Sequence, residues 1–323
     1  MTSLDLLSTN LLSPVVLAFV LGVFASWVKS DLEFPDQIYA ALSIYLLLAL
    51  GLKGGFCLST TSLPEITWPI IATLGLGMFI PFWVYGALRK LGKFSVVDAA
   101  ALAAHYGSVS AVTFLTCMSY LQTLSIPYEG FMPALLAILE VPAIVVGLTL
   151  AFLRSPVHRG SLSEGIKEIF VSKSVLLLIG GLVIGYLTGP VGKEKIGSFF
   201  IDPFQGVLVL FLLELGLVAG RHFKDVLTVG QFLVIFAFLA PVLNGALGVW
   251  IGSLSGLSVG GCTILGVMTA SASYIAAPAA VRISLPEANP GYYLTASLAL
   301  TFPFNLAIGI PLYLMMAEWI CVR

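Results

Sequence analysis

Charged residues are scarce in this chain of 323 residues: together they make up 10% of it, and the net charge is only −1. Soluble domains contain about 25% charged residues. Hydrophobic residues account for 59%, and the mean hydropathy is +1.05. These values exclude a water-soluble enzyme, and the lack of a basic patch excludes nucleic acid as a partner. Since one apolar span needs about 20 residues, the composition predicts an all-α polytopic membrane protein with about ten transmembrane helices.

Motifs of several other protein classes are missing as well. The four cysteines show no C-x-x-C spacing and predict neither a zinc site nor a disulfide framework, so we interpret them as small apolar packing residues: Cys57, Cys117, Cys262 and Cys321. Without H-E-x-x-H or a P-loop, neither a zinc protease nor ATP-driven transport is indicated. Residues 1–10 lack a basic region, so 11–28 is interpreted as a retained first span rather than a cleaved signal. No cofactor is expected other than a coupling ion.

Apolar runs bounded by charges or by Pro and Gly predict where the spans lie. The predicted spans are 11–28, 38–52, 68–88, 96–120, 130–153, 172–188, 203–220, 230–254, 258–282 and 291–317. Most of the 15 Lys and Arg residues fall in the loops that follow odd-numbered spans. The positive-inside rule places these loops in the cytoplasm. Both termini are therefore predicted to lie outside the plasma (bacterial inner) membrane.

Similar short segments recur in the same order and at nearly constant offset in the two halves of the chain. The pairs are Ala49–Gly55 with Glu214–Gly220, Gly107–Ser110 with Ala270–Ser273, Ile126–Pro127 with Leu285–Pro286, and Glu140–Pro142 with Thr301–Pro303. This order predicts two five-helix repeats, 1–154 and 172–323, joined by a short cytoplasmic loop, 155–171. Because five is odd, the second repeat is inverted, as in many secondary transporters. Chance similarity among helices rich in Gly and Ala is the alternative.

Small and hydroxyl residues concentrate in the predicted fourth and ninth spans, which we expect to be broken helices. Where a helix restarts in the membrane, its first N–H groups and its dipole can bind an anion without any Lys or Arg. Ser108 or Ser110 in the fourth span, and Ser271 or Ser273 in the ninth, could cap these ends or donate hydrogen bonds to a ligand. Close packing of small residues is the alternative.

Two acidic residues lie within apolar spans. Burial of a charge in the bilayer costs at least a few kcal/mol, so each acid needs a cation, a proton or a hydrogen bond. Glu140, next to the helix-breaking Pro142, is a candidate sodium or proton ligand, and a structural hydrogen bond to a neighbouring helix is the alternative. Glu214 is a weaker candidate because no helix-breaking residue adjoins it. His105 could carry a proton, or its role could be a structural hydrogen bond only.

One motif points to an enzyme. Gly256–Gly260 fits the G-x-S-x-G pattern around an activated serine, here Ser258. That serine would need a base, and the three histidines lie on or beside other spans. A helix N-cap is therefore the favoured role of Ser258, no enzyme activity is expected, and an intramembrane serine hydrolase is a distant alternative.

As an ordered set, six short motifs resemble the sodium-dependent bicarbonate transporter family best known from cyanobacteria and its bacterial homologues. They are Gly51–Gly55, Val97–Ala99, Gly107–Ser110, Ile126–Glu129, Pro142–Ala143 and Pro286–Pro290. The resemblance implies ten helices in an inverted repeat, a gate part, a core part and a homotrimer. It also implies bicarbonate bound between the broken fourth and ninth helices, with sodium nearby.

The resemblance also assigns site residues. The anion would contact Gly107, Ser108, Val109, Ser110 and Ala111 from one half, and Ser271, Ala272 and Ser273 from the other. Coupling is assigned to Na+ at Glu140, with Ser110, Thr113 and Tyr274.

The chain departs from the family at two places. Tyr274 stands where the cyanobacterial pattern has an aspartate. Because this carboxylate is missing, both sodium and a proton remain candidates for the coupling ion. The connection from Arg154 to Val171 is short, so regulation by a PII-like protein has weak support. The expected function is sodium-driven import of bicarbonate, and the alternative is a proton- or sodium-coupled transporter of another small anion or carboxylate.

Overall fold

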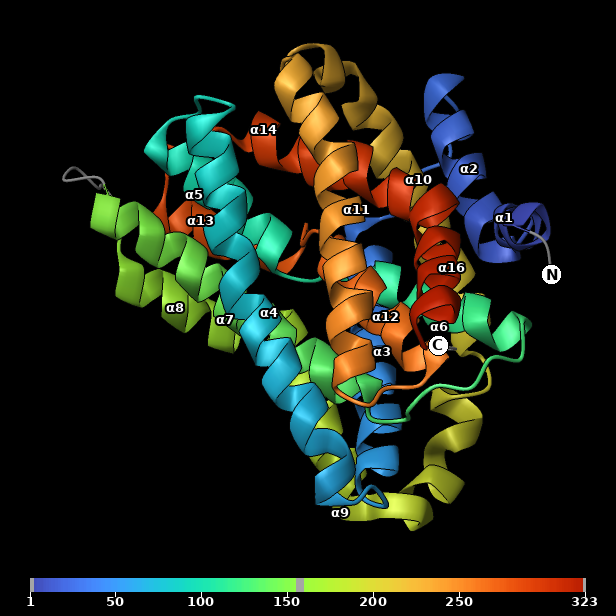
Figure 1. The fold of residues 1–323 in the computed structure, drawn as a ribbon. Helices are drawn as coiled ribbons and strands as arrows, with labels where there is room; N and C mark the ends of the chain where they lie inside the picture. Colours follow the sequence, from blue (N-terminus) through green and yellow to red (C-terminus); the bar gives the residue numbers. More distant parts are fainter. Residues whose placement is uncertain (1–2, 155–159, 322–323) are drawn as a thin grey trace.

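The computed structural model describes residues 3–154 and 160–321; it is 83% helical and contains no strand in these ranges (Figure 1). In the first half the helices are α1 (Ser3–Leu11), α2 (Pro14–Trp27), α3 (Asp36–Leu58), α4 (Leu63–Lys90), α5 (Val96–Gly107), α6 (Ala111–Thr123) and α7 (Met132–Arg154). They are followed by α8 (Leu162–Val171), α9 (Lys173–Phe200), α10 (Phe204–His222), α11 (Gln231–Leu254), α12 (Val259–Ala270), α13 (Ala276–Ser284), α14 (Pro290–Leu294), α15 (Phe302–Phe304) and α16 (Ile310–Cys321).

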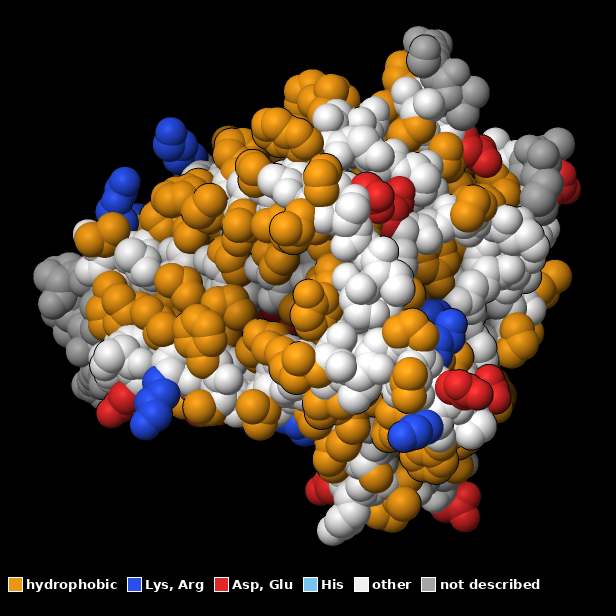
Figure 2. All heavy atoms as spheres, turned by 90° about the horizontal axis from the view of Figure 1, so that it is seen from below, with side chains coloured by type: hydrophobic (Ala, Val, Ile, Leu, Met, Phe, Trp, Pro, Cys, Tyr) orange, Lys and Arg blue, Asp and Glu red, His pale blue; other side chains and the backbone are white. Residues whose placement is uncertain are grey.

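Within the described ranges, eight helical segments are long and apolar enough to cross a membrane, or nine if α1 and α2, which meet at a bend of 58°, form one span. The chain is therefore a multi-pass membrane protein. The expected number of ten is not confirmed, because the ninth predicted span consists of two short helices, α12 with 12 residues and α13 with 9. Many large hydrophobic side chains lie on the surface, and Figure 2 shows them spread over much of one face, as expected for contact with lipid.

Several helix boundaries differ from the prediction. Helix α1, Ser3–Leu11, lies almost entirely before the predicted first span, 11–28, and α2 begins at Pro14 after the N-cap Ser13. The sixth predicted span stops near Gly189–Pro190, but α9 continues to Phe200 because Gly189 adopts a positive φ of 53° and the helix resumes beyond the kink. The predicted loop 155–171 contains α8, and its residues 155–159 lie outside the described residues.

Two helix pairs pack at glycine contacts. In the first pair α2 lies against α10, and a Cβ atom added to Gly22 would stand only 2.9 Å from the Cα of Gly216. In the second pair α3 lies against α9, where a Cβ added to Gly51 would stand 2.9 Å from the Cα of Gly181. Such backbone contact needs residues without side chains, as is common between membrane helices.

The remaining long helices form two bundles. In one, α4, α5 and α7 pack against one another, and in the other α11, α12 and α16 do so. Figure 1 shows the first bundle at the left and the second in the middle and right of the molecule. The chain breaks between α5 and α6 and between α12 and α13 contact each other, since α12 packs against both α5 and α6 and the Ser110 N–H donates to the Ser271 hydroxyl.

Two of the cysteines are far apart in the sequence but contact each other in the structure. The Cys321 thiol of α16 lies 3.3 Å from the Sγ atom of Cys262 in α12, whereas Cys117 is fully buried elsewhere.

Mild oxidation of the purified protein should therefore join Cys262 and Cys321 in a disulfide, seen as one cross-linked peptide by mass spectrometry without reduction. Cys321→Ala should remove that peptide and introduce no pairing of Cys117. An unlinked wild-type protein under these conditions would contradict the α12–α16 packing.

Candidate functional site

The fourth predicted span is broken, as expected, at residues 108–110. Helix α5 ends at Gly107, and Ser108 follows it in an extended conformation. Ser110 is the N-cap of α6: its Oγ accepts a hydrogen bond from the Thr113 N–H at 3.2 Å. The first turn of α6 thus begins inside the protein, where its free N–H groups carry partial positive charge.

The ninth predicted span is broken at the corresponding residues. Helix α12 ends at Ala270, and Ser271 follows it in an extended conformation. The Ser273 Oγ accepts a hydrogen bond from the Ala277 N–H of α13 at 3.2 Å. In each break, therefore, the first serine follows the end of one helix, and the hydroxyl of the second accepts a hydrogen bond from the first turn of the next helix, although the N-cap of α13 itself is Ile275.

Hydrogen bonds join the two breaks directly. The Ser110 N–H donates to the Ser271 Oγ at 2.8 Å, and the Ser273 N–H donates to the His105 carbonyl at 2.9 Å. The Ser110 hydroxyl also donates to the Tyr274 Oη at 3.2 Å. Residues from the two breaks, such as Ser110 and Ser271, which are 161 positions apart in sequence, thus form one polar centre.

Glu140 of α7 borders this centre and is only 6% exposed. The Ser174 hydroxyl of α9 donates to its Oε1 at 2.9 Å, and the Ser108 hydroxyl donates to its backbone carbonyl at 3.2 Å. No Lys or Arg of the described chain forms an ion pair with this carboxylate. The hydrogen bond to a neighbouring helix, named above as the alternative role of Glu140, is thus present.

A small buried cavity of about 20 Å³ connects these groups. It is lined by Leu47, Val109, Ser110, Ala111, Glu140, Ser174, Ser273, Tyr274, Ile275 and Ala276. A cavity needs roughly 10–15 Å³ to hold one water molecule, so this one has room for about one water-sized group. The cavity is thus lined by the starts of both α6 and α13, by one carboxylate and by four residues that carry a hydroxyl group.

The other predicted site residues lie behind this lining. Gly107 does not line the cavity but packs against α4, since an added Cβ would collide with the Pro81 side chain. Ser108, Ser271 and Ala272 are buried, and Ser271 accepts the bond from Ser110 described above. Thr113 is buried with no hydrogen-bond partner for its hydroxyl in the described structure.

Four lining residues were not predicted: Leu47, Ser174, Ile275 and Ala276. Leu47 and Ser174 come from α3 and α9, which contain neither break. No sequence signal distinguished Ser174 from other serines near span ends, and only its contact with Glu140 identifies it.

The remaining candidates lie away from the cavity. Glu214 is 9% exposed on α10 and does not line it. The His105 ring donates from Nδ1 to the Ala101 carbonyl at 2.7 Å and stacks on Tyr293, with ring centroids 4.4 Å apart. Ser258 is the N-cap of α12, as favoured above: its Oγ accepts from the Gly261 N–H at 3.2 Å. His158 lies outside the described residues, and the His222 side chain is likewise not described.

No cluster of three or more His, Cys, Asp or Glu side chains in the described ranges could hold a metal ion. A cation at Glu140 would thus be bound by one carboxylate together with neutral hydroxyl or carbonyl oxygens, the ligand type that hard cations prefer.

Comparison with protein families matches residues 14–318 to the model of the Na+-dependent bicarbonate transporter superfamily. The match includes both helix breaks, Glu140 and Ser174. Comparison with curated proteins gave no match.

Proposed function

We propose that this chain, which belongs to the Na+-dependent bicarbonate transporter superfamily, imports bicarbonate across the plasma membrane with sodium as the coupling ion. The observation that carries the proposal is the meeting of two helix starts and the Glu140 carboxylate in one buried cavity. The amide groups of α6 and α13 supply positive potential for an anion. Glu140 supplies the negative charge that a cation needs, so the two ions would bind close together and stabilise each other.

The packing supports two inverted repeats as part of this proposal. Suppose that α2 of the first half corresponds to α9 of the second, and α3 to α10. The contact between α2 and α10 is then equivalent to the contact between α9 and α3. The α4–α5–α7 bundle corresponds in the same way to α11–α12–α16. A two-fold axis in the membrane plane would produce both correspondences, because it would place each half of the chain in the position of the other.

Contacts between loops support the proposed topology. On the side predicted to be cytoplasmic, the Asn289 N–H at the start of α14 donates to Asp98 in the first turn of α5 at 2.9 Å. On the opposite side, the Ser258 N–H donates to the Glu129 carboxylate at 2.6 Å. Loops assigned to one side of the membrane thus contact each other, and the termini are proposed to lie outside.

The position of the cavity suggests how access could alternate. Its lining combines Ser110, Ser273 and Glu140 from the bundles with Leu47 and Ser174 from the pair α3 and α9. We assign the bundles to the core part and the α2, α3, α9 and α10 helices to the gate part. Because the cavity lies between these parts, sliding of one against the other would open it to either side and enlarge it for the anion.

Proton coupling is the alternative to sodium coupling, and the reason to consider it is the tyrosine at position 274. At the position of the family aspartate, its hydroxyl is hydrogen-bonded to Ser110 and provides no fixed negative charge. Another small carboxylate as substrate is the second alternative, since two helix starts and serine hydroxyls would bind it by the same interactions.

Uptake of labelled bicarbonate into proteoliposomes tests the proposal. We expect an inward sodium gradient to raise uptake, and Ser110→Ala combined with Ser273→Ala to lower the initial rate about tenfold, since each lost hydrogen bond costs about 0.5–1.5 kcal/mol. The matched control, Ser110→Thr with Ser273→Thr, keeps both hydroxyls as acceptors for the Thr113 and Ala277 N–H groups and should retain most activity. Normal uptake by the alanine variant would reject the anion site. Uptake that follows pH and ignores sodium would reject sodium coupling.

A further inference from the structure

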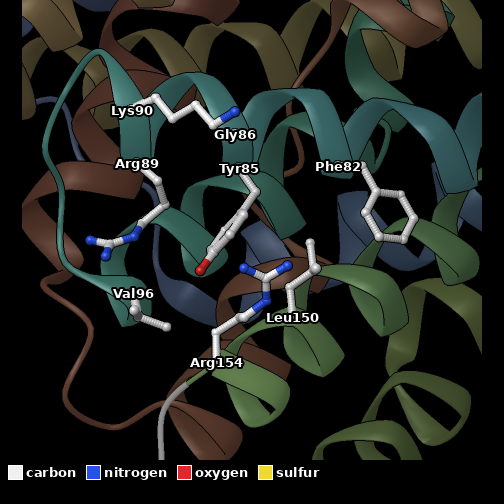
Figure 3. Close-up of a pocket in the computed structure, with 8 residues that line it drawn as sticks. All are labelled: Phe82, Tyr85, Gly86, Arg89, Lys90, Val96, Leu150 and Arg154. Atoms are coloured by element: carbon white, nitrogen blue, oxygen red, sulfur yellow. The ribbon is translucent and has the colours of Figure 1, made fainter.

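A second polar cavity lies at the ends of α4 and α7 and shares no lining residue with the cavity at the breaks. Its volume is about 530 Å³, and it is lined by Phe82, Tyr85, Gly86, Arg89, Lys90, Val96, Leu150 and Arg154. Figure 3 shows Tyr85 extending from α4 and Arg154 from the end of α7 into this space, with Arg89 and Lys90 at the end of α4. The cavity is thus bordered by three cationic side chains.

These cations lack acidic partners in the described structure. Arg89 donates one N–H to the Phe94 carbonyl, a neutral group, and retains its charge. The nearby acid Asp98 accepts from the Ser95 hydroxyl at 2.7 Å and from the Asn289 N–H at 2.9 Å. Three uncompensated positive charges at one cavity attract an anion, and arginine suits the oxygens of a phosphate group.

The other lining residues are apolar. Phe82 is 53% exposed and Leu150 is buried, so one side of the cavity is continuous with the hydrophobic surface of the protein. Cations above an apolar surface form the pattern that recognises an acidic phospholipid at the membrane interface. A free phosphate would use the cations but would leave the apolar side uncovered.

We propose that this cavity binds the phosphate headgroup of an acidic phospholipid, with Arg89, Lys90 and Arg154 contacting the phosphate and Phe82 contacting an acyl chain. The site is independent of the transport proposal, because none of its residues lines the cavity at the breaks.

Gly86 allows a direct test by filling the cavity. An added Cβ at Gly86 would meet no atom within 4 Å, so a larger side chain would occupy free space rather than distort the helix. Gly75 lies on the same helix, is equally open, and does not line the cavity. Gly86→Leu and Gly75→Leu therefore form a matched pair, which differ in whether the new side chain blocks the site.

The experiment measures lipid binding to the full-length protein in detergent by native mass spectrometry, with phosphatidylglycerol and phosphatidylcholine as probes. We expect phosphatidylglycerol to bind at least tenfold more tightly. Arg154→Gln should weaken this binding about fivefold, and Gly86→Leu should weaken it at least as much. Gly75→Leu should leave it unchanged, and all variants should elute like the wild type in size-exclusion chromatography.

Three outcomes would overturn the proposal. In the first, the two lipids bind equally, so the headgroup charge is not recognised. In the second, Gly86→Leu and Gly75→Leu weaken binding equally, so the cavity is not the site. In the third, inorganic phosphate displaces phosphatidylglycerol at equal concentration, which would identify a free anion rather than a lipid as the ligand.

Discussion

Replacement of Glu140 by glutamine should abolish most sodium-driven uptake. Glutamine is nearly isosteric and keeps a carbonyl oxygen for the Ser174 hydroxyl, which donates to Glu140 at 2.9 Å, but it removes the negative charge. A hydrogen bond or ligand contact to a charged group is worth about 1.5–3 kcal/mol, so uptake at low sodium should fall about 10- to 100-fold. The measurement is the initial rate of labelled bicarbonate uptake into proteoliposomes as a function of sodium concentration.

Two further variants separate a cation ligand from a structural hydrogen bond. Ser174→Ala breaks the bond between α9 and Glu140 but leaves the carboxylate in place. If Glu140 binds the cation, Glu140→Gln should impair uptake far more than Ser174→Ala. If Glu140 only joins α7 to α9, Ser174→Ala should do at least as much damage, and Glu140→Gln should be nearly silent. Glu214→Gln is the control for a buried acid that does not line the cavity, and it should transport normally.

The sequence was sufficient to predict the helix breaks because their residues conflict with an uninterrupted membrane helix. Ser108 and Ser110 in one half, and Ser271 and Ser273 in the other, combine small size with side chains that satisfy freed backbone groups. In the structure Ser108 and Ser271 follow helix ends, and the hydroxyls of Ser110 and Ser273 accept hydrogen bonds from the first turns of the helices that follow. Their joining by the Ser110–Ser271 hydrogen bond depends on how the halves pack, which no local pattern encodes.

Other features depended on tertiary context. Gly189–Pro190 is an ordinary helix end in sequence, yet α9 resumes after it and contacts α3 on both sides of the kink, through Gly181 at Gly51 and through Phe199, whose carbonyl accepts from the Tyr45 hydroxyl. Ser174 has no distinguishing neighbours in sequence and becomes a site residue only because α9 lies against α7 near Glu140. The contact of Cys262 with Cys321 likewise arises from packing between α12 and α16.

Substitution of Gly181 by leucine should prevent α9 from packing on α3. An added Cβ at Gly181 would lie 2.9 Å from the Leu48 carbonyl oxygen and 3.0 Å from the Gly51 Cα, both of them backbone atoms that cannot rotate away. The helices would have to separate, and overpacking in a close contact costs about 1–3 kcal/mol or more. We expect a lower thermal unfolding temperature for the purified protein in detergent, and loss of the single peak in size-exclusion chromatography.

The neighbouring Gly180 provides the matched control. It lies in the same helix, and an added Cβ would meet no atom within 4 Å. Leucine has a higher helix propensity than glycine by about 0.8 kcal/mol, so Gly180→Leu should leave stability unchanged or raise it slightly. Equal destabilisation by both substitutions would assign the effect to α9 itself and contradict the close contact with α3.

The same comparison on the other helix pair tests the proposed inverted repeat. A Cβ added to Gly216 of α10 would stand 2.1 Å from the Phe19 carbonyl oxygen of α2, whereas one added to Gly206 would meet no atom within 4 Å. Gly216→Leu should therefore destabilise the protein about as much as Gly181→Leu, and Gly206→Leu should not. If the two helix pairs are equivalent halves of one gate part, their glycine contacts carry equal weight; a stable Gly216→Leu protein would show that they do not.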